Sequence, residues 1–165
     1  MDVLILIGSK SDLDIAEEVT KLLDRFEVKH ELHIASAHRS PDKVKNLVAR
    51  ADTEGAKVII AGAGMSAHLA GVVASITLLP VIGIPIAAGP LNGVDALYST
   101  VNMPGGVPVA TVSIGKAGGK NAALLALRII ALGDESLRSK LSNYREEMAK
   151  AVEETDARLQ DKKIN

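Results

Sequence analysis

Short segments that are apolar throughout alternate along this chain with longer segments in which apolar residues recur every three or four positions. Uninterrupted apolar runs such as 3–7 and 58–61 are typical of strands buried on both faces of a sheet. Strands are predicted at residues 3–7, 28–35, 58–61, 81–86 and 107–114. Apolar positions at helical spacing predict helices at about residues 12–26, 41–54, 67–78, 93–101 and 121–132, with a last helix from Asp134.

This alternation of strands and helices predicts a single α/β architecture. Strands joined through helices run parallel, and right-handed crossovers place helices on both faces of the sheet. The expected fold is a three-layer flavodoxin-like or Rossmann-like fold with a parallel five-stranded sheet and a long C-terminal helix. The strand at 28–35 alternates polar and apolar residues, so we expect it near a sheet edge. The length of 165 residues fits one domain, and we expect residues 1–165 to form a single domain.

Composition and charge narrow the classes of protein to which this chain can belong. The formal net charge of −1 gives no electrostatic support for binding nucleic acid or an anionic membrane. The chain has no cysteine, which excludes disulfides and thiolate chemistry. Its apolar runs are too short for a signal peptide or for a membrane span of roughly 20 residues. We therefore expect a cytoplasmic protein.

Two predicted helices carry much apolar surface for a chain of this size. The segment 121–132 is apolar almost all round, which is typical of a helix buried on every side and favours a homo-oligomer. A seam of apolar residues also follows the last helix, and its members are Leu137, Leu141, Tyr144, Met148, Val152 and Leu159. This seam fits packing on the chain itself or on a neighbouring subunit.

Three loops that follow predicted strands combine small residues with unusual polar ones. They span residues 8–12, 36–40 and 62–69. In an open parallel sheet, ligands bind beyond the carboxyl ends of the strands, where the strand order reverses. The sequence therefore predicts one ligand site shared by these three loops.

The first loop, Gly8-Ser9-Lys10-Ser11-Asp12, lies between a strand and a helix. Free backbone N–H groups at a helix start favour a phosphate, and the serine hydroxyls can donate to the same anion. The Asp12 carboxylate can accept a hydrogen bond from a ribose hydroxyl. The same residues also fit an N-cap turn with a solvated lysine. The pattern leaves both interpretations open.

The second loop holds the sharpest signal, Ser36-Ala37-His38-Arg39. Histidine is the side chain best suited to move protons near neutral pH. The planar guanidinium of Arg39 can bind a phosphate through two N–H groups. The structural alternative is a strand-end histidine that only contacts a backbone carbonyl. Because Ser36 and Arg39 flank it at a predicted ligand edge, we favour a functional His38.

The third loop, Gly62-Ala63-Gly64-Met65-Ser66-Ala67, matches the pattern G-x-G-x-x-A. A dinucleotide site would also need an acidic residue roughly 20 positions further on, and residues 86–89 contain none. We interpret these glycines as room for a substrate beside the backbone. His68 fits either a ligand contact or a buried histidine. The sequence shows neither metal-ligand spacing nor the G-x-S-x-G elbow of serine hydrolases.

Several short motifs follow one another in a characteristic order between Val3 and about Glu154. They are Gly8-Ser9-Lys10-Ser11-Asp12, Ser36-Ala37-His38-Arg39, Ala61-Gly62-Ala63-Gly64 with Ala67-His68-Leu69, Gly93-Val94-Asp95, Met103-Pro104 and Asn121-Ala122-Ala123-Leu124-Leu125-Ala126. Together they resemble the catalytic subunit of phosphoribosylaminoimidazole carboxylase, a family also called N5-carboxyaminoimidazole ribonucleotide mutase.

This resemblance implies a homo-octameric enzyme of de novo purine (IMP) biosynthesis with a flavodoxin-like core and with neither a metal nor an organic cofactor. The implied reaction is an isomerisation that moves a carboxylate from N5 of the aminoimidazole ribonucleotide to ring carbon C4, through enclosed decarboxylation and recarboxylation. By matching motif, His38 would be the general acid and base. The ribose phosphate would be held by Ser9, Ser11, Asp12, Ser36 and Arg39, and the pocket for the base and carboxylate would be lined by Gly64, Ser66, Ala67, His68 and Leu69.

Two alternatives to the mutase stay open at this point. A second branch of the family, typical of animals, carboxylates aminoimidazole ribonucleotide directly with free CO2 and tends to carry Lys in place of Arg39. Arg39 and the segment 62–69 favour the mutase branch. A non-catalytic flavodoxin-like nucleotide-binding module would keep the phosphate loop and would not need His38.

Overall fold

A parallel five-stranded sheet with the order β2-β1-β3-β4-β5 forms the centre of the molecule. The computed structural model describes the backbone of residues 1–163 and the side chains of residues 1–161. The strands are β1 (Val3–Ile7), β2 (His30–Ile34), β3 (Val58–Gly64), β4 (Val81–Ile86) and β5 (Ala110–Thr111). The chain changes direction across the sheet between β1 and β3, which is the flavodoxin-like order. The predicted fold and the edge position of β2 are confirmed.

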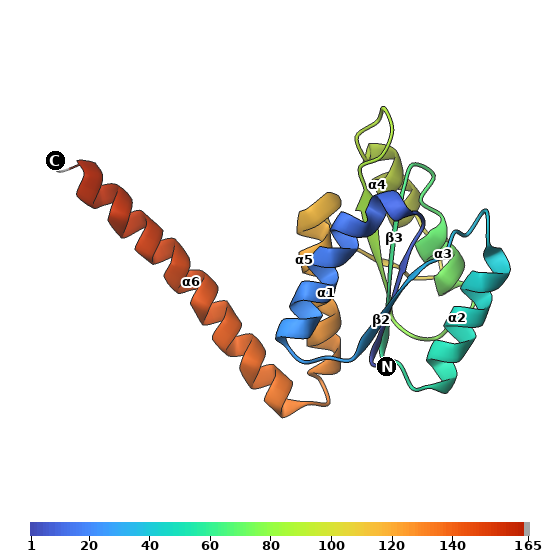
Figure 1. Ribbon diagram of the computed structural model, residues 1–165, viewed down its shortest axis with the longest axis horizontal. Helices are drawn as coiled ribbons and strands as arrows, with labels where there is room; N and C mark the ends of the chain where they lie inside the picture. Colours follow the sequence, from blue (N-terminus) through green and yellow to red (C-terminus); the bar gives the residue numbers. More distant parts are fainter. Residues whose placement is uncertain (164–165) are drawn as a thin grey trace.

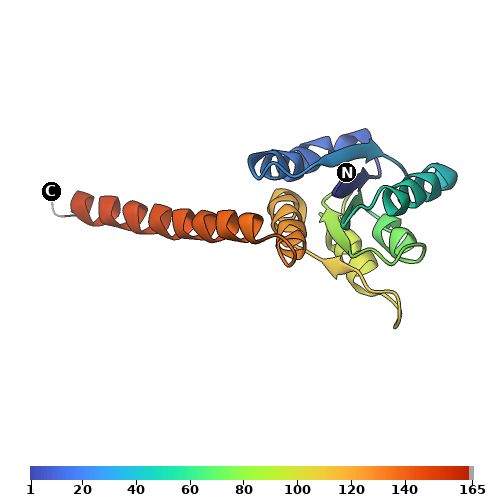
Figure 2. The same cartoon turned by 90° about the horizontal axis from the view of Figure 1, so that it is seen from below.

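Helices cover both faces of the sheet, as Figures 1 and 2 show. One face carries α1 (Leu13–Arg25) and α5 (Gly115–Ile130), and the other carries α2 (Pro41–Thr53), α3 (Leu69–Ala74) and α4 (Val94–Val101). A short 3-10 turn, η1 (Lys10–Asp12), precedes α1, and α6 (Glu135–Lys163) ends the chain. The three layers follow from the connections, because each parallel strand needs a crossover over one face of the sheet.

The apolar run of β1 is explained by burial on both faces. Val3 and Ile5 belong to the core cluster beneath α1 and α5, whereas Leu4 and Leu6 belong to the cluster beneath α2 and α3. All five residues of β1 are buried. A strand with no solvent face has no position for a polar side chain, so the period-2 alternation of an exposed strand disappears.

The region after residue 106 departs from the predicted pattern. The expected strand 107–114 is reduced to Ala110 and Thr111, which pair with Ile82 and Gly83 of β4. Pro108, just before this strand, has no N–H to donate to a ladder. Residues 115–119, which precede the predicted helix 121–132 and contain three glycines, form the first part of α5. A Cβ on Gly118 would lie 1.8 Å from the Ser113 carbonyl oxygen, and one on Gly119 would lie 2.8 Å from that of Ile15. These glycines therefore serve the packing of a helix and not a turn.

The helix predicted at 67–78 is shorter than expected and covers only Leu69–Ala74. Hydroxyl groups at the C-terminal end of this helix compete for the hydrogen bonds of its backbone. Ser75 Oγ donates to the Val72 carbonyl at 2.7 Å, and Thr77 Oγ1 accepts from the Leu79 N–H at 3.1 Å. Such local side-chain bonds offer the backbone an alternative to a further helical turn.

The apolar seam of α6 divides into two parts. Asp134 caps the helix, since its Oδ1 accepts from the Leu137 N–H at 2.9 Å. Leu137 is buried, and Tyr144 packs edge-on against Phe26 with ring centroids 5.6 Å apart. Beyond this point α6 extends away from the body of the molecule (Figure 1), and Met148, Val152 and Leu159 are exposed. The first half of the seam therefore packs on the chain itself, and the second half is uncovered.

The apolar helix predicted at 121–132 is not buried on every side within one chain. Ala122, Ala123, Ala126 and Leu127 of α5 are fully buried against the sheet and α1. Leu124, Leu125, Ile129 and Ile130 are only partly buried, and Leu132 beyond the helix is exposed. The remaining apolar surface keeps the expectation of a partner subunit open.

Candidate active site

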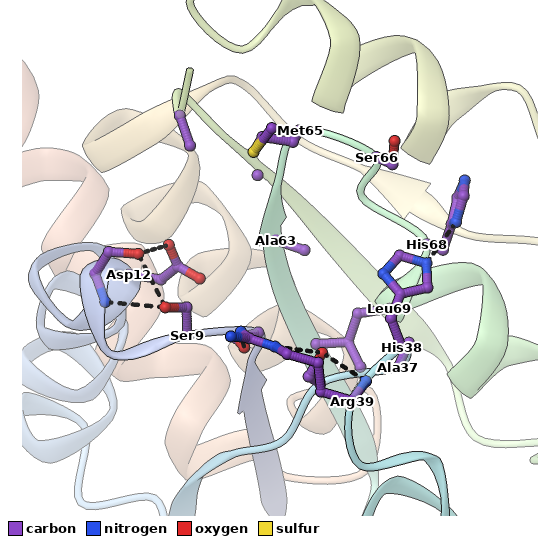
Figure 3. Close-up of a pocket in the computed structure, with 15 residues that line it drawn as sticks. Ser9, Asp12, Ala37, His38, Arg39, Ala63, Met65, Ser66, His68 and Leu69 are labelled. Carbon is purple, nitrogen blue, oxygen red and sulfur yellow. Dashed lines mark hydrogen bonds between the residues drawn. The ribbon is translucent and has the colours of Figure 1, made fainter.

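One pocket of about 540 Å³ lies at the carboxyl end of the sheet and is lined by all three of the loops that the sequence singles out. Figure 3 shows its walls, with Ser9 and Asp12 on one side, His38 and His68 on the other, and Ala63 between them. Of the residues expected at a site, the pocket is lined by Ser9, Ser11, Asp12, Ser36, His38, Arg39, Gly64, Ser66, His68 and Leu69. The fold therefore brings together residues from separate parts of the sequence.

Ala67 is the one expected site residue that does not line this pocket. Its side chain is 2% exposed and belongs to the interior. Five further residues line the pocket, namely Gly8, Ala37, Ala63, Met65 and Ala88. Ala88 lies outside the three predicted loops, but it follows β4, so the rule that ligands bind beyond strand ends could have found it.

The loop between β2 and α2 is closed by hydrogen bonds to Ser36. Ser40 stands at the N-cap position of α2, but its hydroxyl does not cap the helix. It accepts from the Ser36 N–H at 2.9 Å and donates to the Ser36 carbonyl at 3.2 Å. The Arg39 N–H donates to Ser36 Oγ at 3.2 Å. These bonds fix a tight turn from which Ala37, His38 and Arg39 line the pocket.

The loop after β1 gathers hydroxyl groups around a buried carboxylate. Ser9 Oγ accepts from the Ser11 N–H at 3.4 Å, which caps the η1 turn. The Ser11 hydroxyl lies 3.1 Å from both Ser9 Oγ and Asp12 Oδ1. Asp12 is 4% exposed, and this burial raises the pKa of its carboxyl above the ordinary value, against the opposing hydrogen bond from Ser11.

Arg39 supplies the pocket's positive charge. Of the lining residues in the described part of the chain, it alone carries a permanent cation. Its Nη2 donates to the Gly8 carbonyl at 3.1 Å, and its Nε lies 3.5 Å from Ser36 Oγ. The guanidinium thus bridges the loops after β1 and β2. An arginine fork beside three serine hydroxyls is a favourable environment for a phosphate.

His38 and His68 are in direct contact, although 30 positions separate them. His38 Nε2 lies 2.9 Å from His68 Nδ1, and the two rings are nearly perpendicular at 81°. One nitrogen of this pair must carry the shared proton, which leaves His38 Nδ1 and His68 Nε2 free for other partners. His68 is exposed to the pocket, so the interpretation of a buried histidine is wrong.

The glycines of the third loop have a packing role. A Cβ on Gly62 would lie 3.2 Å from Ile86 Cδ1, and one on Gly64 would lie 2.6 Å from Ala88 Cβ. The sequence predicts that these glycines leave room for a substrate, and the structure adds that β3 needs them to approach β4 and the residues after it.

A Gly64→Ala variant is therefore expected to be destabilised. The added methyl overpacks the β3–β4 contact, and overpacking typically costs about 1–3 kcal/mol. Urea unfolding followed by circular dichroism would measure the change. Gly133→Ala is the matched control, because an added Cβ there meets no atom within 4 Å. Equal midpoints for Gly64→Ala and the wild type would contradict this role.

Two further properties of the described residues bear on the site. Within residues 1–163, no cluster of three or more histidine or acidic side chains is arranged to hold a metal ion. None of the helices in that range combines the length and apolar character needed to cross a bilayer.

Comparisons with known proteins agree on one family. The model of the family "AIR carboxylase" matches residues 2–151. The N5-carboxyaminoimidazole ribonucleotide mutase of Pyrococcus horikoshii is 48% identical over 157 residues, which cover 95% of this chain and 88% of the relative. The protein of that name from Escherichia coli K12 is 47% identical over 143 residues, covering 87% and 85%. The crystal structure of Treponema denticola PurE superposes with a TM-score of 0.86 at 33% identity, covering 95% and 97%. Because the family match spans nearly the whole chain and these relatives are similar along most of their length, this chain belongs to the AIR carboxylase family.

Proposed function

We propose that this chain is an N5-carboxyaminoimidazole ribonucleotide mutase of de novo purine biosynthesis. It converts N5-carboxyaminoimidazole ribonucleotide into 4-carboxy-5-aminoimidazole ribonucleotide and is therefore an isomerase. The observation that carries the proposal is the pocket, in which three separate motifs of the family place Ser9, His38 and His68 around one cavity. Relatives that bear this enzyme name at 47–50% identity support it.

The phosphate of the substrate binds at the serine and arginine end of the pocket. Arg39 provides two N–H groups in one plane, and the hydroxyls of Ser9, Ser11 and Ser36 line the same region. The Asp12 carboxylate lies beside these serines and accepts hydrogen bonds from the ribose hydroxyls. This arrangement leaves the aminoimidazole ring on the side of the histidines.

His38 performs both proton transfers. It first donates a proton to N5 of the carbamate, so that the N5–carboxylate bond breaks and its electron pair stays on nitrogen, which releases CO2 and leaves aminoimidazole ribonucleotide. C4 of the ring then attacks CO2, and the neutral His38 removes the proton that C4 still carries. The proton given in the first step is recovered in the last. Contact with His68 orients the His38 ring throughout.

The small side chains of the pocket keep CO2 beside the ring. Ala37, Ala63, Gly64 and Leu69 line the pocket together with the histidines. They offer no strong hydrogen-bonding groups that would retain water in place of CO2. Apolar walls beside the ring favour recapture of the released gas over its escape.

Activity assays with two substrates test the proposal directly. Purified protein should convert N5-carboxyaminoimidazole ribonucleotide without added bicarbonate. The same preparation should show little conversion of aminoimidazole ribonucleotide unless bicarbonate is high. Turnover that appears only with aminoimidazole ribonucleotide and high bicarbonate would contradict the mutase and support the direct carboxylase. Binding of either nucleotide without turnover would support the non-catalytic module.

We further propose that the chain assembles as a homo-octamer. The uncovered half of the α6 seam, with Met148, Val152 and Leu159, supports an additional apolar partner. The partly buried Leu124 and Leu125 of α5 support one as well. Burial of apolar surface of this kind provides the driving force for association.

Sedimentation velocity is expected to show a single species with the mass of an octamer of 17.3-kDa chains. Replacing Val152 and Leu159 together by Asp should shift the distribution toward smaller species, because charges would then lie in a dry interface. Replacing exposed Lys150 and Arg158 of the same helix by Gln is the control and should leave the mass unchanged. A wild-type monomer at low micromolar concentration would overturn the proposal.

The proposed setting is the cytoplasm, and the proposed working unit is a single catalytic domain comprising residues 1–165. A chain without cysteine needs no oxidising compartment for its fold, which supports this setting. Its partners are a phosphoribosyl substrate and further copies of itself. The near-zero net charge supports neither a nucleic-acid nor a membrane partner.

A further inference from the structure

Gly8 lies on the floor of the pocket, directly after β1. The parallel register pairs Leu6 with Ala61 and Ile7 with Gly62, so Gly8 continues beside Ala63 on the same face of the sheet. Its N–H donates to the Gly62 carbonyl at 3.1 Å, and its own carbonyl accepts from Arg39 Nη2 at 3.1 Å. The backbone of Gly8 therefore contacts the other two loops of the pocket. The position that a side chain would occupy at residue 8 faces the pocket.

The fold itself does not require glycine at this position. Gly8 is not among the residues with positive φ, so an L side chain can adopt its backbone conformation. A Cβ added here would meet Ala63 Cβ and Asp12 Oδ2 at 3.8 Å and the Gly62 carbonyl oxygen at 4.0 Å, which are ordinary van der Waals distances. Gly64 and Gly118 differ, since their Cβ atoms would lie 2.6 Å and 1.8 Å from protein atoms.

We propose that Gly8 is a specificity-determining residue that leaves room on the pocket floor for the ribose ring of the substrate. The inference rests on the proposed function. The phosphate end is formed by Ser9 and Arg39, and the histidines lie on the opposite side (Figure 3). The ribose spans the pocket floor between the phosphate end and the histidines. A methyl group at residue 8 would stand between Ala63 and the Asp12 carboxylate, in the space that the sugar and its hydroxyls occupy.

Gly8→Ala tests this inference, with Gly133→Ala as the matched control. Gly133 also has ordinary φ and no atom within 4 Å of an added Cβ, and it lies outside the pocket. Three quantities are measured for each protein. They are the midpoint of thermal unfolding, the Kd for aminoimidazole ribonucleotide by calorimetry, and the inhibition constant of inorganic phosphate.

We expect Gly8→Ala to unfold at or above the wild-type temperature, since replacing glycine in an unstrained conformation lowers the entropy of the unfolded chain. Its Kd for aminoimidazole ribonucleotide should rise by about 10- to 200-fold, the usual effect of one carbon atom that does not fit a pocket. The inhibition constant of inorganic phosphate should stay within about twofold of the wild-type value, because phosphate alone has no ribose to place.

Three results would each overturn the inference. They are a wild-type Kd for aminoimidazole ribonucleotide in Gly8→Ala, an equal loss of affinity for phosphate and nucleotide, and a lowered unfolding midpoint in that variant. The first would mean that the floor is free of substrate, and the others would mean that the methyl distorts the loop. Failure of the proposed function appears differently, as a wild-type protein that does not bind or convert the nucleotides at all.

Discussion

His38→Asn is expected to lower the turnover of N5-carboxyaminoimidazole ribonucleotide by about 10²- to 10⁴-fold, the usual contribution of a positioned general acid and base. Asparagine has nearly the size of the imidazole and still offers hydrogen bonds, but it cannot donate and recover a proton in this pH range. The substrate should therefore still bind, with a Kd within about threefold of wild type. Steady-state rates and calorimetric titration of each protein separate the two effects.

The control for this experiment is His33→Asn. His33 lies on β2, where its Nε2 contacts Glu31 Oε2 at 3.0 Å, and it is not a lining residue of the pocket. Its replacement removes a histidine from the same polypeptide without touching the site, so turnover should be retained. Near-wild-type turnover by His38→Asn would refute the general acid and base role. Equal losses in both variants would assign the effect to stability.

Arg39→Gln is expected to weaken substrate binding by about 10- to 150-fold. The variant loses charge-assisted hydrogen bonds to the phosphate, and hydrogen bonds to charged groups are worth about 1.5–3 kcal/mol. Arg39 is the permanent cation among the lining residues, so no neighbouring lining residue compensates for it. The change should appear in KM and in the Kd for aminoimidazole ribonucleotide, and kcat should change less because the phosphate takes no part in the proton transfers.

Two comparison variants sharpen this result. Arg39→Lys keeps the charge and loses the planar fork, so its KM should lie between those of the wild type and Arg39→Gln. Arg138→Gln on α6 removes an exposed arginine that is 4.0 Å from Glu135 and far from the lining residues, and it should bind substrate normally. An unchanged KM in Arg39→Gln would show that the phosphate binds elsewhere.

The elements that the sequence predicts best are those with a regular pattern of residues along the chain. β1 and β4 are found at the predicted residues, since strands buried on both faces have uninterrupted apolar runs. The three polar loops are found at one pocket, because the carboxyl ends of parallel strands share one edge. The sequence prediction is wrong at β5 and at the start of α5. There the structural role of proline and glycine depends on residues that are distant in the sequence.

The sequence by itself determined the order of strands and helices along the chain, the sheet edge at which the pocket lies and the family motifs that line it. It did so because burial and strand ends leave regular patterns along a chain. Only the tertiary structure decided which atoms meet across elements. It brought His38 Nε2 to 2.9 Å from His68 Nδ1 and buried Ala67. It also showed that packing requires glycine at residue 64 but not at residue 8. These outcomes depend on distances of a few ångströms between segments far apart in the sequence, and no local pattern records them.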